Sequence, residues 1–241
     1  MASVNSIKGI EKKKGELEEE LRLLDEYDIG ELCSVIKDVG FSCTLCGKCC
    51  TNEFNGHVFL LDDDIERVKS LRPDAIVPAP YFELCDQHGN FYVSGYSLKS
   101  KENGECIFLK DKRCMIYEDR FSICRIYPYM LHREYGDDGK LAWRQISGLN
   151  EHGEYNTEIP DDECRQAAEE TIAYEKAFLK KEIDFYSDAL GHFTESGLRP
   201  VRKIYDRGIR AFNAGEPVTA FVHYRGEFER NTLKMSEYII R

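Results

Sequence analysis

The segment FSCTLCGKCC places four cysteines within eight residues, at Cys43, Cys46, Cys49 and Cys50. A C-x2-C step brings two sulfur atoms toward one point, because the chain turns tightly between them. The step is repeated here and a further cysteine follows at once, which is close to the bacterial ferredoxin run except for its last spacing. Gly47 gives the loop the backbone freedom to wrap around an ion or a cluster. The run therefore predicts a metal-binding centre.

The neighbouring thiols of Cys49 and Cys50 raise a question of grouping. Adjacent side chains are expected to point apart, so these two cysteines are expected to serve two centres unless one of them bridges.

The ten cysteines of this 241-residue chain favour metal binding over disulfides. The amino terminus, MASVNSIKGIEKKKGELEEE, is charged where a signal peptide would be apolar. We therefore expect a reducing, cytoplasmic location, where crowded cysteines usually bind metal. No apolar run approaches the roughly 18 residues of a membrane span, so no membrane association is expected.

The formal net charge of −11 argues against general nucleic-acid binding, because affinity for polyanions comes from clustered lysine and arginine. The segment RPVRKIYDRGIR is a local exception, with five basic residues falling roughly on one helix face: Arg199, Arg202, Lys203, Arg207 and Arg210. This face is either a solvated surface or a docking patch for an acidic partner.

A second set of cysteines follows at Cys106, Cys114 and Cys124. The first two flank a predicted hairpin in CIFLKDKRC. If its register is symmetric about residue 110, the two thiols are directly opposed and within reach of one metal. Cys164 lies in the predicted first turn of a helix, where the helix dipole favours a thiolate. It is an eighth candidate ligand, although ordinary packing is also compatible with this position.

The remaining cysteines and the histidines are not assigned to the centre. Cys33 falls on the apolar stripe of a predicted helix, and Cys85 has no partner at a spacing suited to metal, so both are interpreted as structural. A lone histidine is more often structural than a ligand, and His57, His88 and His132 are left out for that reason.

The pattern predicts an α+β fold with an irregular, cysteine-rich centre of short strands and hairpins, flanked by N-terminal and C-terminal helices. Helices are expected at residues 5–27, 30–39, 63–70, 161–190, 199–213 and 217–239. Strands are expected in the runs HVFLL, FYVSGYSL, CIFL, CMIY and LAWRQI. The corresponding regions are an N-terminal helical segment at 1–40, a metal-binding domain at 41–165 and a helical region at 166–241 packed on it.

The cysteine run and the segment GECIFLKDKRCMIYEDRFSICRIYP together resemble the YkgJ-type cysteine-cluster (CxxCxxCC) family of zinc- or iron-chelating domains. The matching positions are Cys114, Ile116, Tyr117, Arg120, Cys124, Arg125, Tyr127 and Pro128. Phe121 stands where the family has proline. The resemblance covers about residues 41–165 and implies metal binding without implying a reaction.

Two of the matching residues are arginines that could offset the charge of a metal centre. Four thiolates around Zn²⁺ or an oxidised [4Fe–4S] core leave a net charge of −2, which Arg120 and Arg125 could offset through hydrogen bonds to sulfur. Surface salt bridges are the alternative role for both.

All-sulfur coordination suits zinc or an iron–sulfur cluster, and the compactness of the 43–50 run favours the cluster, with [4Fe–4S] first. The predicted ligands are Cys43, Cys46, Cys49, Cys50, Cys106, Cys114, Cys124 and Cys164. The expected role is electron transfer or metal handling, with a protein or redox partner.

Two other functional classes stay open. A related cysteine-cluster family is associated with lysine methylation, which makes a cluster-dependent protein-modifying enzyme one alternative. The chain has no Gly-rich dinucleotide loop and no C-x3-C-x2-C radical triad in support of it. A zinc-stabilised interaction scaffold is the other.

Overall fold

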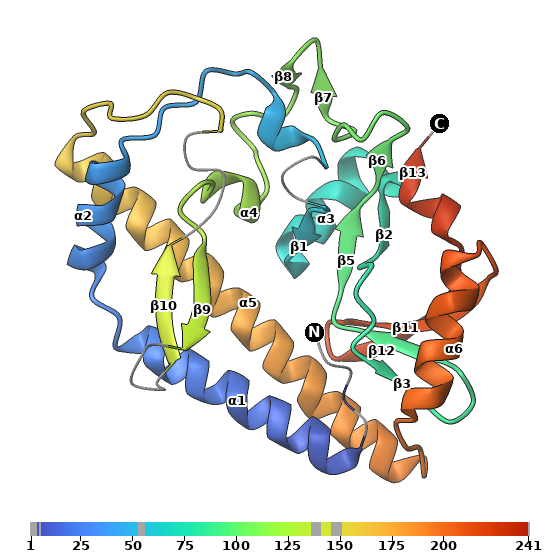
Figure 1. Ribbon diagram of the computed structural model, residues 1–241. Coiled ribbons are helices and arrows are strands. Elements are labelled where there is room, and N and C mark those ends of the chain that lie inside the picture. Colours follow the sequence, from blue (N-terminus) through green and yellow to red (C-terminus); the bar gives the residue numbers. More distant parts are fainter. Residues whose placement is uncertain (1–3, 5, 53–55, 136–140, 146–150, 241) are drawn as a thin grey trace.

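The computed structural model describes residues 4, 6–52, 56–135, 141–145 and 151–240 (Figure 1). The α-helices are α1 (Ile7–Asp25), α2 (Ile29–Val39), α3 (Asp62–Leu71), α4 (Ser122–Arg125), α5 (Asp161–Glu195) and α6 (Arg202–Asn213). Short 3-10 helices are η1 (Lys48–Cys50), η2 (Pro73–Ala75) and η3 (Met235–Tyr238). The strands of the central region are β1 (Phe59–Leu60), β2 (Ile76–Pro78), β3 (Leu84–Cys85), β4 (Phe91–Val93), β5 (Tyr96–Leu98), β6 (Ser100–Lys101), β7 (Leu109–Lys110), β8 (Arg113–Cys114), β9 (Leu131–Tyr135) and β10 (Leu141–Gln145). The C-terminal strands are β11 (Val218–Tyr224), β12 (Glu227–Leu233) and β13 (Ile239–Ile240).

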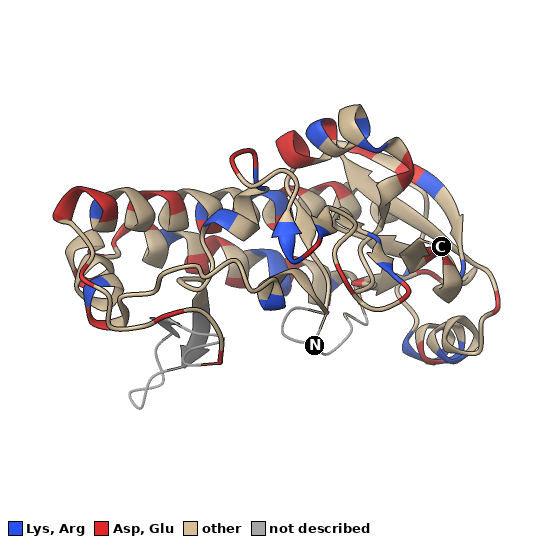
Figure 2. Cartoon of the chain, turned by 90° about the horizontal axis from the view of Figure 1, so that it is seen from above, with Lys and Arg blue, Asp and Glu red and all other residues tan. Residues whose placement is uncertain are grey.

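Three helices form one layer of the molecule, with α1 and α2 packed along the 35-residue helix α5. The Ser6 side chain caps α1 and the Asp28 side chain caps α2, while Gly40 ends α2 in the left-handed conformation with φ 50°. Leu17 and Phe185 belong to the core that this layer buries. Acidic and basic residues are interspersed along the helices (Figure 2). The helices predicted at both ends of the 41–165 region are thus present, and the α+β class is confirmed.

The helix predicted at 217–239 is wrong. Residues 218–233 form the hairpin β11–β12, and η3 occupies only Met235–Tyr238. Apolar residues at 218, 221 and 222 fit helical spacing as well as strand spacing, but the β-branched and aromatic residues of VTAFVHY suit a strand. Arg225 and Gly226 supply the two left-handed residues of a tight hairpin turn, with φ of 51° and 78°.

The four-stranded sheet β12-β11-β4-β3 lies between two cores. In β4, Phe91 and Val93 face one core while Tyr92 faces the core shared with α5, as the strand alternation requires. Strand β11 runs parallel to β4, with Ala220 opposite Phe91. Helix α6 packs on the Phe91 side, where Gly208 leaves room for the aromatic ring. The sheet therefore joins the helical layer to the rest of the molecule.

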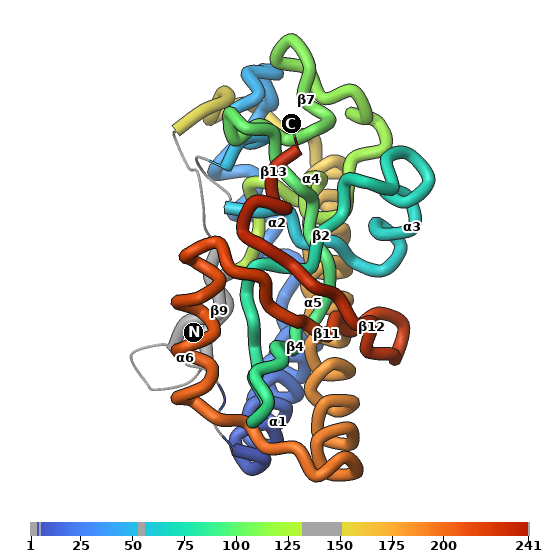
Figure 3. The backbone as a smooth tube through the Cα atoms, turned by 90° about the vertical axis from the view of Figure 1, so that its right-hand side faces the viewer, coloured from blue at the N-terminus to red at the C-terminus, as the bar shows by residue number. Residues whose placement is uncertain are grey.

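The C-terminus returns to the cysteine-rich end of the molecule. Strand β13 pairs in parallel with β6, just before Cys106, and lies near the β7–β8 end in Figure 3. A three-stranded sheet, β1-β5-β2, lies between this region and the larger sheet in Figure 1. No helix in the described part of the chain is both long and apolar enough to cross a membrane.

Candidate metal centre

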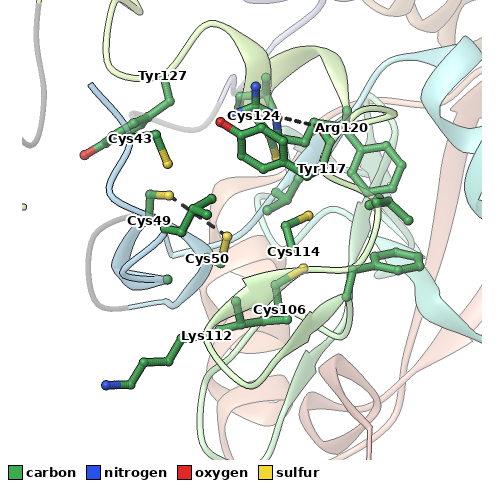
Figure 4. A pocket seen from close by; sticks show the side chains of 18 of the residues that line it. Cys43, Cys49, Cys50, Cys106, Lys112, Cys114, Tyr117, Arg120, Cys124 and Tyr127 are labelled. Carbon is green, nitrogen blue, oxygen red and sulfur yellow. Dashed lines mark hydrogen bonds between the residues drawn. The ribbon is translucent and has the colours of Figure 1, made fainter. Parts of the chain in front are cut away.

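Six of the eight predicted ligand cysteines line one pocket: Cys43, Cys49, Cys50, Cys106, Cys114 and Cys124. Figure 4 shows their side chains around the same space. Most other side chains of the wall are apolar, among them Phe108, Phe121 and Ile116. The space open to the centre of a water molecule is about 90 Å³. The pocket is thus a largely apolar chamber rich in thiols.

The loop that carries the first four cysteines is fastened at both ends. Ser42 exchanges two backbone hydrogen bonds with Glu154, at 2.8 and 3.0 Å. Gly47 adopts a φ of 77°, and the chain then enters η1, whose turn closes with the Cys50 amide donating to the Gly47 carbonyl at 3.0 Å. The loop is therefore held in a defined shape by the backbone.

Cys49 and Cys50 do not point apart as expected. Their Sγ atoms lie 4.0 Å from one another and both line the pocket. The reason is η1, because a 3-10 helix rotates successive side chains by about 120°, whereas an extended strand would place them on opposite faces. The geometry of Cys49 and Cys50 therefore gives no support to the expectation that they serve separate centres.

Backbone hydrogen bonds join the cysteine loop to the segment that carries Cys106. The Cys106 amide donates to the Cys50 carbonyl at 2.7 Å, and the Asn52 amide donates to the Gly104 carbonyl at 2.9 Å. A bridge between Thr51 and Glu105 lies between these two bonds. This short ladder sets the two thiols side by side, although 55 positions separate them in sequence.

The hairpin is present, but its register differs from the symmetric one assumed about residue 110. Cys114 pairs with Leu109, and the turn consists of Asp111 and Lys112 at φ 49° and 62°. Both central residues are therefore left-handed, which gives a two-residue turn with its centre between them. Cys106 lies before β7, outside the ladder. The two thiols still line the same pocket without being directly opposed.

Cys124 reaches the pocket from the short helix α4. Asp64, which is 1% exposed, accepts hydrogen bonds from the Ser122 amide at 3.2 and 3.3 Å and from the Ser122 hydroxyl at 3.2 Å. The same carboxylate pairs with Arg67 at 2.5 Å, and Arg67 donates to the carbonyls of Asp119 and Arg120. Helix α3 thus fixes the start of α4 and with it the position of Cys124.

The thiols influence one another electrostatically. Burial raises the pKa of Cys106 to about 11, and the neighbouring Cys114 contributes to the increase. Burial also raises the pKa of Cys124, with further contributions from Cys106 and Cys49. Cys50 has a raised pKa because its thiol is hydrogen-bonded to Cys49. The same hydrogen bond, together with the charge of Arg120, lowers the pKa of Cys49 to about 7.

A bound metal would change the electrostatics of this pocket. Several thiolates confined together repel one another, and a bound cation would reverse that balance by stabilising every ionised thiol. The thiol donor set therefore fits zinc, iron or an iron–sulfur cluster.

Arg120 and Tyr117 form the polar part of the wall. The Arg120 Nε donates to the Tyr117 carbonyl at 2.9 Å, and its guanidinium lies 4.0 Å from the centre of the Tyr117 ring. Burial raises the pKa of the Tyr117 hydroxyl, and the nearby Cys43 thiol adds to the increase. Arg125 is exposed and lines a separate hollow between α4 and α5, so the structure places only Arg120 at the pocket.

Two predicted ligands lie outside the pocket wall. Cys46 is part-buried. Burial raises the pKa of Tyr127, which does line the pocket, and the nearby Cys46 adds to the increase. Cys164 is 1% exposed in the core of the helical layer, and its Sγ donates to the Ile159 carbonyl at 3.7 Å. Cys33 packs against that same core, and Cys85, in strand β3 of the larger sheet, is buried in the other core.

His57, which was not predicted as a ligand, lines the pocket together with the thiols. Burial lowers the pKa of its imidazole to about 4, and the ring packs against Tyr81 with centroids 4.6 Å apart. In the sequence, only its position seven residues after Cys50 indicated that His57 could lie near the cysteines. His88 lies in the turn before β4, and the side chain of His132, in β9, is outside the described residues.

The thiols share a pocket without being gathered about one point. Within the described ranges, no three Cys, His, Asp or Glu side chains lie close enough together to hold a metal ion. Metal binding therefore requires the thiol side chains to rotate toward the ion.

Comparison with known proteins places the pocket cysteines in a described family domain. A family model, CxxCxxCC, described as "Putative zinc- or iron-chelating domain", matches residues 42–164, which include every cysteine of the pocket. The chain belongs to the CxxCxxCC family. Zinc or iron chelation is the property for which the CxxCxxCC family is described, and the metal-binding prediction is confirmed at that level.

An uncharacterized protein of Methanocaldococcus jannaschii is 29% identical to this CxxCxxCC protein over 110 residues. The matched part is 44% of this chain and 53% of the archaeal protein, so the chain spans about half the length of that curated relative. No solved structure matches the chain.

Proposed function

We propose that the pocket holds an iron–sulfur cluster, with [4Fe–4S] as the first expectation, and that the protein transfers electrons or handles metal in the cytoplasm. The supporting observation is that six thiols line one pocket. A structural zinc ion takes four ligands in a closed tetrahedral site. A cluster of iron and sulfide is a larger guest that cysteine thiolates hold through its iron atoms.

The protein residues have distinct parts in this proposal. Cys49, Cys50, Cys106, Cys114 and Cys124 interact electrostatically and supply thiolates from three segments of the chain. Arg120 offsets part of the negative charge of the loaded centre. Burial of charge next to an arginine and apolar walls is among the factors that set a cluster potential.

Cys43 gives the centre its contact with solvent. Its side chain is exposed, whereas the other pocket cysteines are part-buried. Tyr117 lines the pocket together with this thiol, and a hydrogen bond from its hydroxyl to a ligand sulfur would withdraw negative charge from that sulfur. Electrons are therefore expected to enter and leave on the Cys43 side.

The experiment is purification without oxygen, followed by measurement of iron, acid-labile sulfide and zinc, and by visible absorbance. We expect a brown protein with equal amounts of iron and sulfide. A colourless protein with one or two zinc ions and no sulfide would overturn the proposal. Two zinc ions would point to a six-thiolate site shared between them.

Single cysteine-to-serine variants assign the ligands. Replacing Cys106 or Cys124 is expected to abolish most of the cluster absorbance. Cys33→Ser is the matched control, because Cys33 lies on α2 against the helical core and outside the pocket. Cys164→Ser tests the eighth predicted ligand, and its buried position in the helical core predicts retained iron.

A further inference from the structure

The rim of the cysteine pocket carries an unusual charge for this chain. Residues 41–52 and 106–117 contain the exposed cations Lys48, Lys110, Lys112 and Arg113, with Asp111 as their one acidic residue, and the acidic residues Glu105, Glu118 and Asp119 directly flank the second segment. The two segments therefore carry three net positive charges, whereas the whole chain carries −11. The described part of the chain has no carboxylate paired with these four cations.

The two basic segments form one surface. A Cβ placed on Gly47 would lie 3.5 Å from the Lys112 Cα and 3.3 Å from the Leu109 side chain, so the hairpin tip rests directly on the loop that contains Lys48. Lys112 itself lines the pocket beside Cys106 and Cys114 in Figure 4. We call Lys48, Lys110, Lys112 and Arg113 the basic rim.

Exposed apolar side chains accompany the basic rim. Leu45, next to Cys46, is 43% exposed, and Met115, next to Cys114, is 57% exposed. Protein interfaces combine apolar contacts of this kind with charged residues around them. A surface made for phosphate binding alone would gain nothing from these two side chains.

We propose that the basic rim is the docking surface for an acidic electron-carrier protein, which exchanges electrons with the centre beneath it. This inference rests on the proposed iron–sulfur function and adds the chemistry of the partner. Opposite charge on the partner would raise the rate of encounter. The negative charge of the remaining surface would disfavour other orientations, because it repels the same partner within a Debye length of about 10 Å.

The basic face of α6 is the competing surface, and it lacks these features. Its cations Arg202, Lys203, Arg207 and Arg210 are exposed, but Arg202 is paired with Asp206 at 2.8 Å. None of the residues of α6 lines the cysteine pocket. This face therefore provides a matched control.

The test compares two double variants that each change the charge by the same amount. Lys110→Glu with Arg113→Glu alters the basic rim, and Lys112 is kept because its φ of 62° belongs to the turn. Lys203→Glu with Arg207→Glu alters α6. Binding of an acidic plant-type ferredoxin is measured by surface plasmon resonance on the anaerobically purified protein, at low and at physiological ionic strength.

For the wild type we expect binding that weakens as salt is added. The rim variant is expected to lose about tenfold in association rate at low salt, and the α6 variant to stay within about twofold of wild type. Equal losses in both variants, or no loss in the rim variant, would overturn the proposal. Tighter binding of anionic phospholipid vesicles or of single-stranded DNA than of ferredoxin would overturn it in favour of those partners.

The metal content of each variant separates this proposal from the proposed function. A zinc-containing protein would contradict the iron–sulfur assignment and with it the electron exchange, whereas the binding assay would still test whether the basic rim docks an acidic protein. Iron and sulfide retained at wild-type levels, with no ferredoxin binding, would contradict the docking surface alone.

Discussion

Asp64 shows how one buried carboxylate positions a distant ligand. It joins α3 to the start of α4 through Ser122, and it holds Arg67 against the backbone at residues 119 and 120.

Asp64→Ala would leave the Arg67 charge and the Ser122 amide without their acceptor. We expect the free energy of unfolding to fall by about 3 kcal/mol and metal content to fall with it, as measured by urea denaturation and metal analysis. Asp63→Ala, at an exposed site in the same helical turn, should cost less than about 1 kcal/mol. Equal losses in the two variants would contradict this role.

Glu83 is a second residue whose charge state affects stability. Burial raises the pKa of its carboxyl well above the ordinary 4.5, and the nearby negative charge of Glu182 adds to the effect. Ser94 donates to one oxygen at 2.9 Å, while the other is shielded from solvent without a hydrogen-bond partner among the described residues.

The folded state holds the Glu83 proton more tightly than the unfolded state does. The contribution of protonated Glu83 to the free energy of unfolding is therefore complete below pH 4.5, and it decreases as the pH rises toward the raised pKa. Glu83→Gln removes that ionisation and is expected to be more stable than wild type at pH 8 by about 1–2 kcal/mol. The difference should shrink toward pH 5. Denaturation at both pH values, with the exposed Glu169→Gln as control, measures it. A benefit of the same size at both pH values would show that ionisation is not its cause.

At the scale of elements, the close contact between α6 and β4 depends on Gly208, which has no side chain. A Cβ on Gly208 would lie 2.6 Å from the Phe91 ring, so Gly208→Ala must push the helix away from the sheet. We expect a loss of about 1–3 kcal/mol, although alanine is the better helix former. Gly191→Ala in α5 meets no atom within 4 Å and should instead stabilise the protein by about 0.5–1 kcal/mol. Thermal denaturation of the two variants should therefore give shifts of opposite sign, and shifts of the same sign would contradict the close packing.

Elements also show how far the sequence could lead. Apolar stripes located α1, α2, α5 and α6, with Gly40 marking the end of α2, and the aspartates that suit a helix N-terminus located α3. The hairpin register could not be read in this way, since Asp111–Lys112 lacks the Asn-Gly or Asp-Gly signature of its turn. The arrangement of Cys49 and Cys50 was equally hidden, because it depends on a three-residue 3-10 helix. Strands β11 and β12 were missed because their apolar residues fit two periods at once.

At the scale of the whole molecule, the pocket joins parts of the chain that the sequence keeps far apart. The sequence identified the cysteines from their spacing, and six of the eight line one pocket. It could not show that Cys164 belongs to the helical core, because a first-turn cysteine has the same local pattern whether it faces a metal or a neighbouring helix. Nor could it show that His57 lines the pocket, since tertiary contacts alone bring the ring there.

The two cores predict how the protein responds to loss of its metal. Phe108 and Phe121, which line the pocket, share one core with Val222 and Leu233 of the larger sheet, whereas the helices α1, α2 and α5 bury the other. Removing the metal under anaerobic conditions should therefore raise amide hydrogen exchange first in residues 43–52 and 104–125, by about tenfold or more. Peptides from α1 and α5 serve as internal controls and should change little. Hydrogen-exchange mass spectrometry measures both sets in one sample. A uniform increase along the chain would instead mean that the metal stabilises both cores together through β4, whose residues are buried on both faces of the sheet.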